Sequence, residues 1–262
     1  MPTELPRFDG GWAGPDIANG SDAWMIHLSD AEIGEIDRTV RALKAKEIVE
    51  IDREDAPLPI LEPKIAAMRE DLLNGRGFAQ IRGFPIERYS LAEAARAFWA
   101  IGTHLGAAVS QNAKGHALGH VRDLGFDYAV ASARGYQTNA RLPYHTDSGD
   151  VVGLLSVKTS RTGGMSSLVS SVALYNAMAE RRPDLALVLM EPTFRDRRDE
   201  IPAHRRPWYP MPVFNPHKGR MLTHYVRSAI RKAQRFDLVP RITPAQEEAF
   251  DDLDALAVGP EF

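Results

Sequence analysis

The stretch that decides the fold runs from Tyr144 to Ser171 and reads YHTDSGDVVGLLSVKTSRTGGMSSLVSS. Apolar and polar residues alternate along it, and Val, Leu, Ser and Thr dominate, which is typical of half-buried strands. A turn signal, Arg161-Thr162-Gly163-Gly164, lies in the middle. The sequence therefore predicts two or three strands here, separated by that turn.

Helices are predicted on both sides of this stretch. Three of them begin with a capping box, in which Ser or Thr and a Glu or Gln three residues later satisfy the first backbone N–H groups. The boxes are Ser29 with Glu32, Ser90 with Glu93, and Thr243 with Gln246. Further helices are predicted over 62–73, 172–178 and 183–190, and further strands over 78–84 and within 208–225. An α+β protein follows, with a mainly helical first part, residues 1–75.

Composition narrows the classes of function. The chain has 262 residues, 44% hydrophobic and 26% charged, which predicts one globular domain over residues 1–262. It has no cysteine, which excludes disulfides, thiolate metal sites and cysteine nucleophiles. A net charge of -3 argues against nucleic acid, and the short apolar runs argue against a membrane span. A cytoplasmic protein with a small-molecule substrate is expected, and a homo-oligomer stays open.

Two side chains of the quoted stretch suit a metal ion. Residues two apart on a strand project from one face, so His145 and Asp147 can present an imidazole nitrogen and a carboxylate oxygen to the same ion. A second histidine would complete the two-His, one-carboxylate triad that suits Fe(II). The triplet alone is weak, because His-x-Asp also arises by chance, and a histidine without a metal is the alternative.

The wider pattern resembles the taurine dioxygenase-like (TauD/TfdA) family. The likeness rests on an aromatic residue before His-x-Asp, a strand, then Gly-Gly with a hydroxyl residue, an Asn-containing helix and the Arg-Pro-Asp-Leu start of the next helix. It implies a double-stranded β-helix (jelly-roll) over 76–262 with helices outside. It also implies a dioxygenase that uses Fe(II), 2-oxoglutarate and O2 to hydroxylate an aliphatic C–H bond, with release of succinate and CO2.

The resemblance also carries roles to single residues. His145 and Asp147 match the first two iron ligands, and Ser166 matches a residue that contacts 2-oxoglutarate. The family's second histidine and its arginine for 2-oxoglutarate belong to a late His-x-Arg region that this sequence does not show. Two alternatives stay open: the third ligand and the last strands lie beyond Phe262, or another residue replaces that ligand, with His224 as the best candidate.

Other residues and functions are weighed more briefly. The segment 107–143 lacks periodicity, and Tyr136 and Arg141 within it are the candidates for contact with substrate. Arg227 and Arg231 are expected to be solvated surface charges. A cupin-like metal enzyme that does not use 2-oxoglutarate, and a non-catalytic β-helix binding protein without the third ligand, are the alternative functions.

Overall fold

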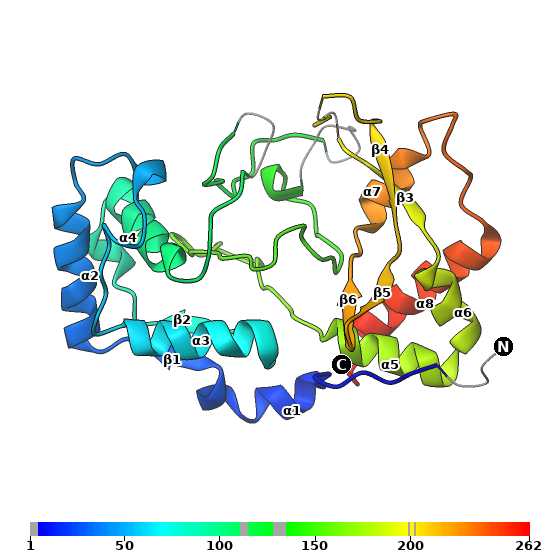
Figure 1. Cartoon of the computed structure of the whole chain (residues 1–262), viewed down its shortest axis with the longest axis horizontal. Helices are drawn as coiled ribbons and strands as arrows, with labels where there is room; N and C mark the ends of the chain where they lie inside the picture. The colour runs from blue at the N-terminus through cyan, green and yellow to red at the C-terminus, as the bar shows by residue number, and fades with distance from the viewer. Residues whose placement is uncertain (1–4, 111–114, 128–134, 199, 202) are drawn as a thin grey trace. The chain divides into compact units, whose positions relative to one another are not determined.

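The computed structural model describes residues 5–110, 115–127, 135–198, 200–201 and 203–262 (Figure 1). The described residues form two compact units. The C-terminal unit comprises residues of Met1–Ile17, Ser110–Gly149 and Ser167–Phe262, and the N-terminal unit comprises Ala18–Val109 and Asp150–Ser166. Each unit has a hydrophobic core of its own. The expectation of one domain over residues 1–262 stays a prediction.

The N-terminal unit is built from three amphipathic helices and one pair of parallel strands. The helices are α2 (Asp30–Ala42), α3 (Glu62–Asn74) and α4 (Leu91–Thr103), and the strands are β1 (Met25–His27) and β2 (Gln80–Arg82). Both predicted capping boxes are present at α2 and α4. Ile36 of α2, Ala97 of α4 and Leu58 between η2 (Ile48–Glu50) and α3 are buried together in the core of this unit.

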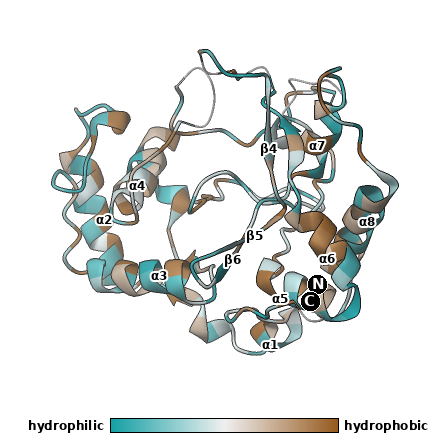
Figure 2. Cartoon of the chain, turned by 45° about the vertical axis from the view of Figure 1, so that its right-hand side comes forward, coloured by the Kyte–Doolittle hydropathy of each residue, from teal (hydrophilic) through white to brown (hydrophobic). Residues whose placement is uncertain are grey.

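The C-terminal unit packs helices beside two antiparallel hairpins. Its helices are α5 (Ser171–Arg181), α6 (Pro183–Met190), α7 (Arg227–Ala233) and α8 (Pro244–Val258). Its strands are β3 (Thr193–Asp196), β4 (Trp208–Met211), β5 (Phe214–His217) and β6 (Arg220–Thr223), paired β3 with β4 and β5 with β6. Figure 2 shows the hydrophobic ribbon of α6, whose Leu185, Ala186 and Leu189 are buried.

Short elements complete the two units. They are α1 (Gly14–Ala18) and the 3-10 helices η1 (Ser21–Ala23), η2 (Ile48–Glu50), η3 (Ile86–Arg88) and η4 (Gly135–Gln137). The turn between β5 and β6 places Lys218 and Gly219 at φ 48° and 76°, the left-handed conformations that a tight hairpin requires. No helix in the described ranges combines the length and the apolar character needed to cross a membrane.

The prediction of strands between Tyr144 and Ser171 is wrong for this structure. Within the described residues, no strand occurs between β2 and β3. Leu154 is 77% exposed and Met165 is 91% exposed, so the alternating pattern has no buried face on which to pack. The α+β class is confirmed, and the described residues of segment 107–143 are irregular as expected apart from η4. The three strand pairs by themselves do not form a jelly-roll.

Candidate metal centre

The structure brings the side chains of His145 and Asp147 together. His145 Nε2 lies 4.0 Å from Asp147 Oδ1, and the two side chains are 36% and 58% exposed. Two donors on one ion, each about 2.1 Å from the metal, lie between about 3 Å apart at neighbouring positions and about 4.2 Å apart at opposite ones. The observed distance lies within that range, and an approach of about 1 Å would bring the two donors to the neighbouring positions of a facial arrangement.

The imidazole ring of His145 is oriented by a hydrogen bond to the backbone. Its Nδ1 lies 2.8 Å from the carbonyl oxygen of Pro143. Because a carbonyl oxygen can only accept, Nδ1 carries the proton in this hydrogen bond, and the neutral ring then has its lone pair on Nε2. Metal-binding histidines commonly use the second ring nitrogen in this way, which fixes the tautomer and the ring plane. Nε2, the nitrogen that faces Asp147, is therefore the one available to a cation.

A third ligand is not part of this arrangement. Within the described ranges, no three His, Asp or Glu residues lie close enough together to hold a metal ion. The candidate His224 places its Nε2 3.4 Å from the hydroxyl of Tyr209. Burial, and then the positive charge of Arg195, lower the pKa of His224. His224 is therefore a neutral, half-buried histidine beside a phenol.

The structure gives the positions of the three other predicted site residues, Ser166, Tyr136 and Arg141. Ser166 is exposed and belongs to the N-terminal unit, whereas His145 and Asp147 belong to the C-terminal unit. Tyr136 lies in η4, where its carbonyl oxygen accepts from the backbone N–H of Arg122 at 3.0 Å. Arg141 is exposed. The roles of Ser166, Tyr136 and Arg141 stay predictions.

Arg227 and Arg195 are largely buried, unlike most surface arginines. Arg227 was expected to be solvated, but its side chain is only 15% exposed and forms ion pairs with three carboxylates of α8. Arg231 is 55% exposed, in line with the expectation. Arg195 on β3 is fully buried and donates to backbone carbonyl oxygens, including that of His224 at 2.5 Å. Its burial is not visible in the sequence, because β3 is too short to show a pattern.

Sequence reasoning also missed the contact that holds the His145–Asp147 segment. The backbone N–H of Thr146 donates to the carbonyl oxygen of Tyr225 at 2.9 Å, and the backbone N–H of Tyr225 donates to Thr146 Oγ1 at 2.9 Å. The two residues are 79 positions apart, so no local spacing signals their pairing.

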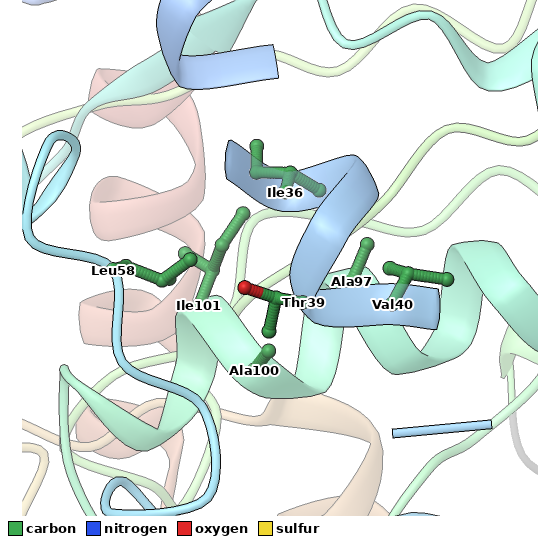
Figure 3. A pocket seen from close by; sticks show the side chains of 7 residues that line it. All are labelled: Ile36, Thr39, Val40, Leu58, Ala97, Ala100 and Ile101. Carbon is green, nitrogen blue, oxygen red and sulfur yellow. The ribbon is translucent and has the colours of Figure 1, made fainter. Parts of the chain in front are cut away.

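A closed gap in the N-terminal unit is not a competing site. It lies between α2, α4 and the chain at Leu58, and side chains from all three line it (Figure 3). Ile36, Val40, Leu58 and Ile101 supply its apolar walls, and Thr39 supplies a single hydroxyl. An apolar gap of this kind is part of a helical core, and it offers a ligand no set of polar groups.

This chain is similar in sequence to a known protein family and to known proteins. The model of the family described as "Taurine catabolism dioxygenase TauD, TfdA family" matches residues 39–262. "FR-33289 synthase" of Streptomyces rubellomurinus is 28% identical over 253 residues, which cover 95% of this chain and 74% of that protein. "Taurine hydroxylase-like protein SAT17" of Stachybotrys chartarum is 27% identical over 227 residues, which cover 82% of this chain and 57% of that protein.

Proposed function

Because this chain belongs to the taurine catabolism dioxygenase TauD, TfdA family, we propose that it is an Fe(II)- and 2-oxoglutarate-dependent dioxygenase. The reaction proposed is hydroxylation of an aliphatic C–H bond of a small molecule, with release of succinate and CO2. The hydroxylase in the name of the Stachybotrys relative supports this reaction class. A cytoplasmic location is part of the proposal.

One observation carries the proposal: His145 Nε2 faces Asp147 Oδ1 at 4.0 Å while Nδ1 is held by Pro143. An imidazole nitrogen and a carboxylate oxygen are two of the three ligands in the facial triad of non-haem Fe(II) oxygenases. The third ligand would be the second histidine of the triad, and His224 is the candidate for it within this chain. The jelly-roll core is proposed with it, supported by family membership.

Each residue has a defined task in this mechanism. His145 and Asp147 hold the iron, and the Asp147 carboxylate also offsets part of its positive charge. The hydroxyl of Ser166 donates a hydrogen bond to a 2-oxoglutarate carboxylate. Tyr136 and Arg141 line the substrate side and determine which small molecules enter. When bound, iron and 2-oxoglutarate supply the oxidation chemistry, while the protein orients them and limits access of water.

The test is anaerobic addition of Fe(II) and 2-oxoglutarate, followed by visible absorption and, after oxygen is admitted, by succinate formation. The wild-type chain should develop the weak charge-transfer band of the iron chelate and release succinate. Asp147→Ala and His145→Ala should reduce both signals to background, because each removes a metal ligand. Asp150→Ala, which removes an exposed carboxylate three residues away, should match the wild type.

The outcomes separate the alternatives. Succinate formation at the wild-type rate in Asp147→Ala would refute the role of Asp147 as a ligand. Metal binding without the charge-transfer band would favour a cupin-like enzyme that does not use 2-oxoglutarate. A wild-type chain that binds neither metal nor 2-oxoglutarate would favour the non-catalytic binding protein.

A further inference from the structure

The residue between the two proposed ligands is tied to a distant part of the chain. Thr146 forms two hydrogen bonds with the backbone of Tyr225, one through its N–H and one through its hydroxyl, each 2.9 Å long. The two bonds use both backbone polar groups of Tyr225. A single residue thus holds the segment at two points, and one of the points depends on its side chain.

The backbone of residues 224 and 225, to which Thr146 is bonded, is itself held by further hydrogen bonds. The N–H of His224 donates to the carbonyl oxygen of Val213 at 2.9 Å, and the carbonyl oxygen of His224 accepts from the buried Arg195 at 2.5 Å. Together with the two bonds to Thr146, all four backbone polar groups of residues 224 and 225 are satisfied. Satisfied backbone groups at a partly buried site resist movement, because opening them exposes unpaired donors and acceptors.

The side chain of Tyr225 also fixes this residue within the C-terminal unit. It is 5% exposed, and its hydroxyl donates to Asp254 Oδ1 of α8 at 2.9 Å. The ring lies 6.1 Å from that of Phe250, which is fully buried in the same core. Tyr225 therefore connects the segment at Thr146 to the hydrophobic core of the C-terminal unit.

The consequence for the ligands follows from chain geometry. Tyr144 packs against the core and Thr146 bonds to Tyr225, whereas the side chains of His145 and Asp147 are partly exposed. Fixing the backbone at 146 fixes the directions in which both neighbouring side chains leave the chain.

We propose that Thr146 is a positioning residue that holds His145 and Asp147 in metal-binding register by clamping their backbone to Tyr225. The inference rests on the proposed function, since it assumes that these two residues bind a metal. Without the clamp, the exposed segment would sample other conformations, and metal binding would have to restrict them. Loss of a group that orients metal ligands typically lowers metal affinity about 10- to 100-fold.

The test uses the full chain, with Co(II) alone as the probe, titrated by calorimetry into wild type, Thr146→Val, Thr146→Ser and Thr223→Val. Thr146→Val removes the hydroxyl at nearly constant volume and should weaken Co(II) binding about tenfold or more. Thr146→Ser keeps the hydroxyl and should bind as the wild type does. Thr223→Val is the matched control, because the buried Thr223 hydroxyl has no hydrogen-bond partner among the described residues.

Hydrogen exchange of the metal-free proteins supplies a readout independent of metal. Peptides that contain Thr146 should exchange faster in Thr146→Val than in wild type, and Thr146→Ser should restore their protection. Equal exchange and equal Co(II) affinity in Thr146→Val and wild type would overturn the clamp.

Asp147→Ala separates this inference from the proposed function. If Asp147→Ala loses Co(II) while Thr146→Val retains wild-type affinity, the metal site stands and the positioning role is refuted. If Asp147→Ala binds Co(II) as tightly as the wild type does, or if the wild type binds no Co(II), the proposed function fails. The exchange data then still decide whether the Thr146 hydroxyl holds the segment.

Discussion

At the scale of single residues, His224 makes stability depend on pH. Burial, followed by the nearby Arg195, lowers its pKa below the usual value of 6.5. As pH falls below about 6.5, the unfolded chain binds a proton at this position before the folded protein does. The free energy of unfolding should therefore fall as pH falls from about 6.5 to the folded-state pKa, and the contribution of neutral His224 should be fully present above that window.

Urea unfolding of wild type and His224→Gln checks this expectation. Glutamine cannot titrate, so the variant should lose less stability than the wild type between pH 7.5 and 5.5. Between pH 7.5 and 8.5, the difference between the two proteins should stay constant, because neither gains a proton at position 224. If the free energy of unfolding changes with pH in the same way for both proteins from pH 7.5 to 5.5, His224 does not contribute to the pH dependence of stability.

At this scale the sequence predicted the proximity of two side chains that are close together in the chain, and their role as metal ligands stays a prediction. His145 and Asp147 are two positions apart, and the structure brings their donor atoms within 4.0 Å. The contacts that fix them are long-range: Thr146 meets Tyr225 across 79 positions, and Arg195 reaches His224 across 29. No spacing rule connects residues that far apart, so the hydrogen bonds that hold this segment were not predictable, whereas the proximity of His145 and Asp147 was.

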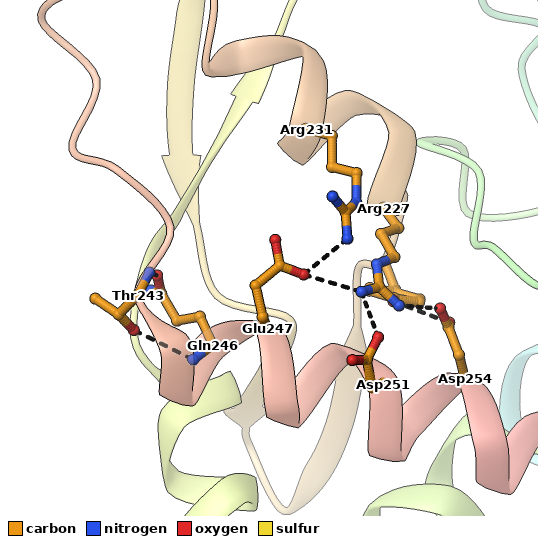
Figure 4. Close-up of polar contacts among 8 residues, drawn as sticks. Arg227, Arg231, Thr243, Gln246, Glu247, Asp251 and Asp254 are labelled. Carbon is orange, nitrogen blue, oxygen red and sulfur yellow. Dashed lines mark hydrogen bonds and ion pairs between the residues drawn. The ribbon is translucent and has the colours of Figure 1, made fainter.

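At the scale of elements, Arg227 joins α7 to α8 (Figure 4). Its guanidinium donates to Asp254 at 2.6 Å, to Asp251 at 2.5 Å and to Glu247 at 3.0 Å. Burial disfavours its charged form, but the carboxylates outweigh burial and raise the pKa of Arg227 above its usual range. The three carboxylates lie on successive turns of α8, so this single side chain bridges residues 247–254 of that helix.

Arg227→Met should therefore destabilise the chain by about 2 kcal/mol, since it leaves partly buried carboxylates without their charged donor. Arg231→Met is the matched control: Arg231 is on the same helix, is 55% exposed and pairs only with Glu247 among the ion pairs found. Its loss should cost less than about 1 kcal/mol. Equal urea midpoints for the two variants would contradict the role of Arg227 as the inter-helix tie.

Element prediction was strongest where side chains cap the backbone locally. All three capping boxes form as expected, at Ser29, Ser90 and Thr243. The helix predicted over 183–190 is α6 with the same bounds. These signals work because a capping side chain bonds to a backbone group three residues away. The orientation of Arg227 depends instead on α8, which the spacing of Arg227 and Arg231 does not reveal.

At the scale of the whole molecule, strands were predicted less well than helices. A helix satisfies its backbone within its own segment, whereas a strand needs a partner that other residues supply. The alternation from Tyr144 to Ser171 describes a segment able to form strands, but the described strand pairs do not include it. The hairpin of β5 and β6 was predictable in part, since its partner follows after a two-residue turn.

The two units should respond separately to the loss of core packing. Leu58 is 1% exposed and belongs to the core of α2, α3 and α4, and Leu189 is fully buried in the core of α5, α6 and α8. The two clusters share no residue. Leu58→Ala and Leu189→Ala remove the same atoms from sites of equal burial, so each should cost about 3 kcal/mol within the unit that contains it.

Hydrogen exchange by peptide should locate each effect. Leu58→Ala should accelerate exchange in peptides of α2, α3 and α4 and leave those of α5, α6 and α8 near their wild-type rates, and Leu189→Ala should do the reverse. Co(II) affinity should follow the same division, because His145 and Asp147 belong to the C-terminal unit. Leu58→Ala should bind Co(II) as the wild type does under native conditions. Equal acceleration across both sets of helices in either variant would show that the two cores unfold as one cooperative body.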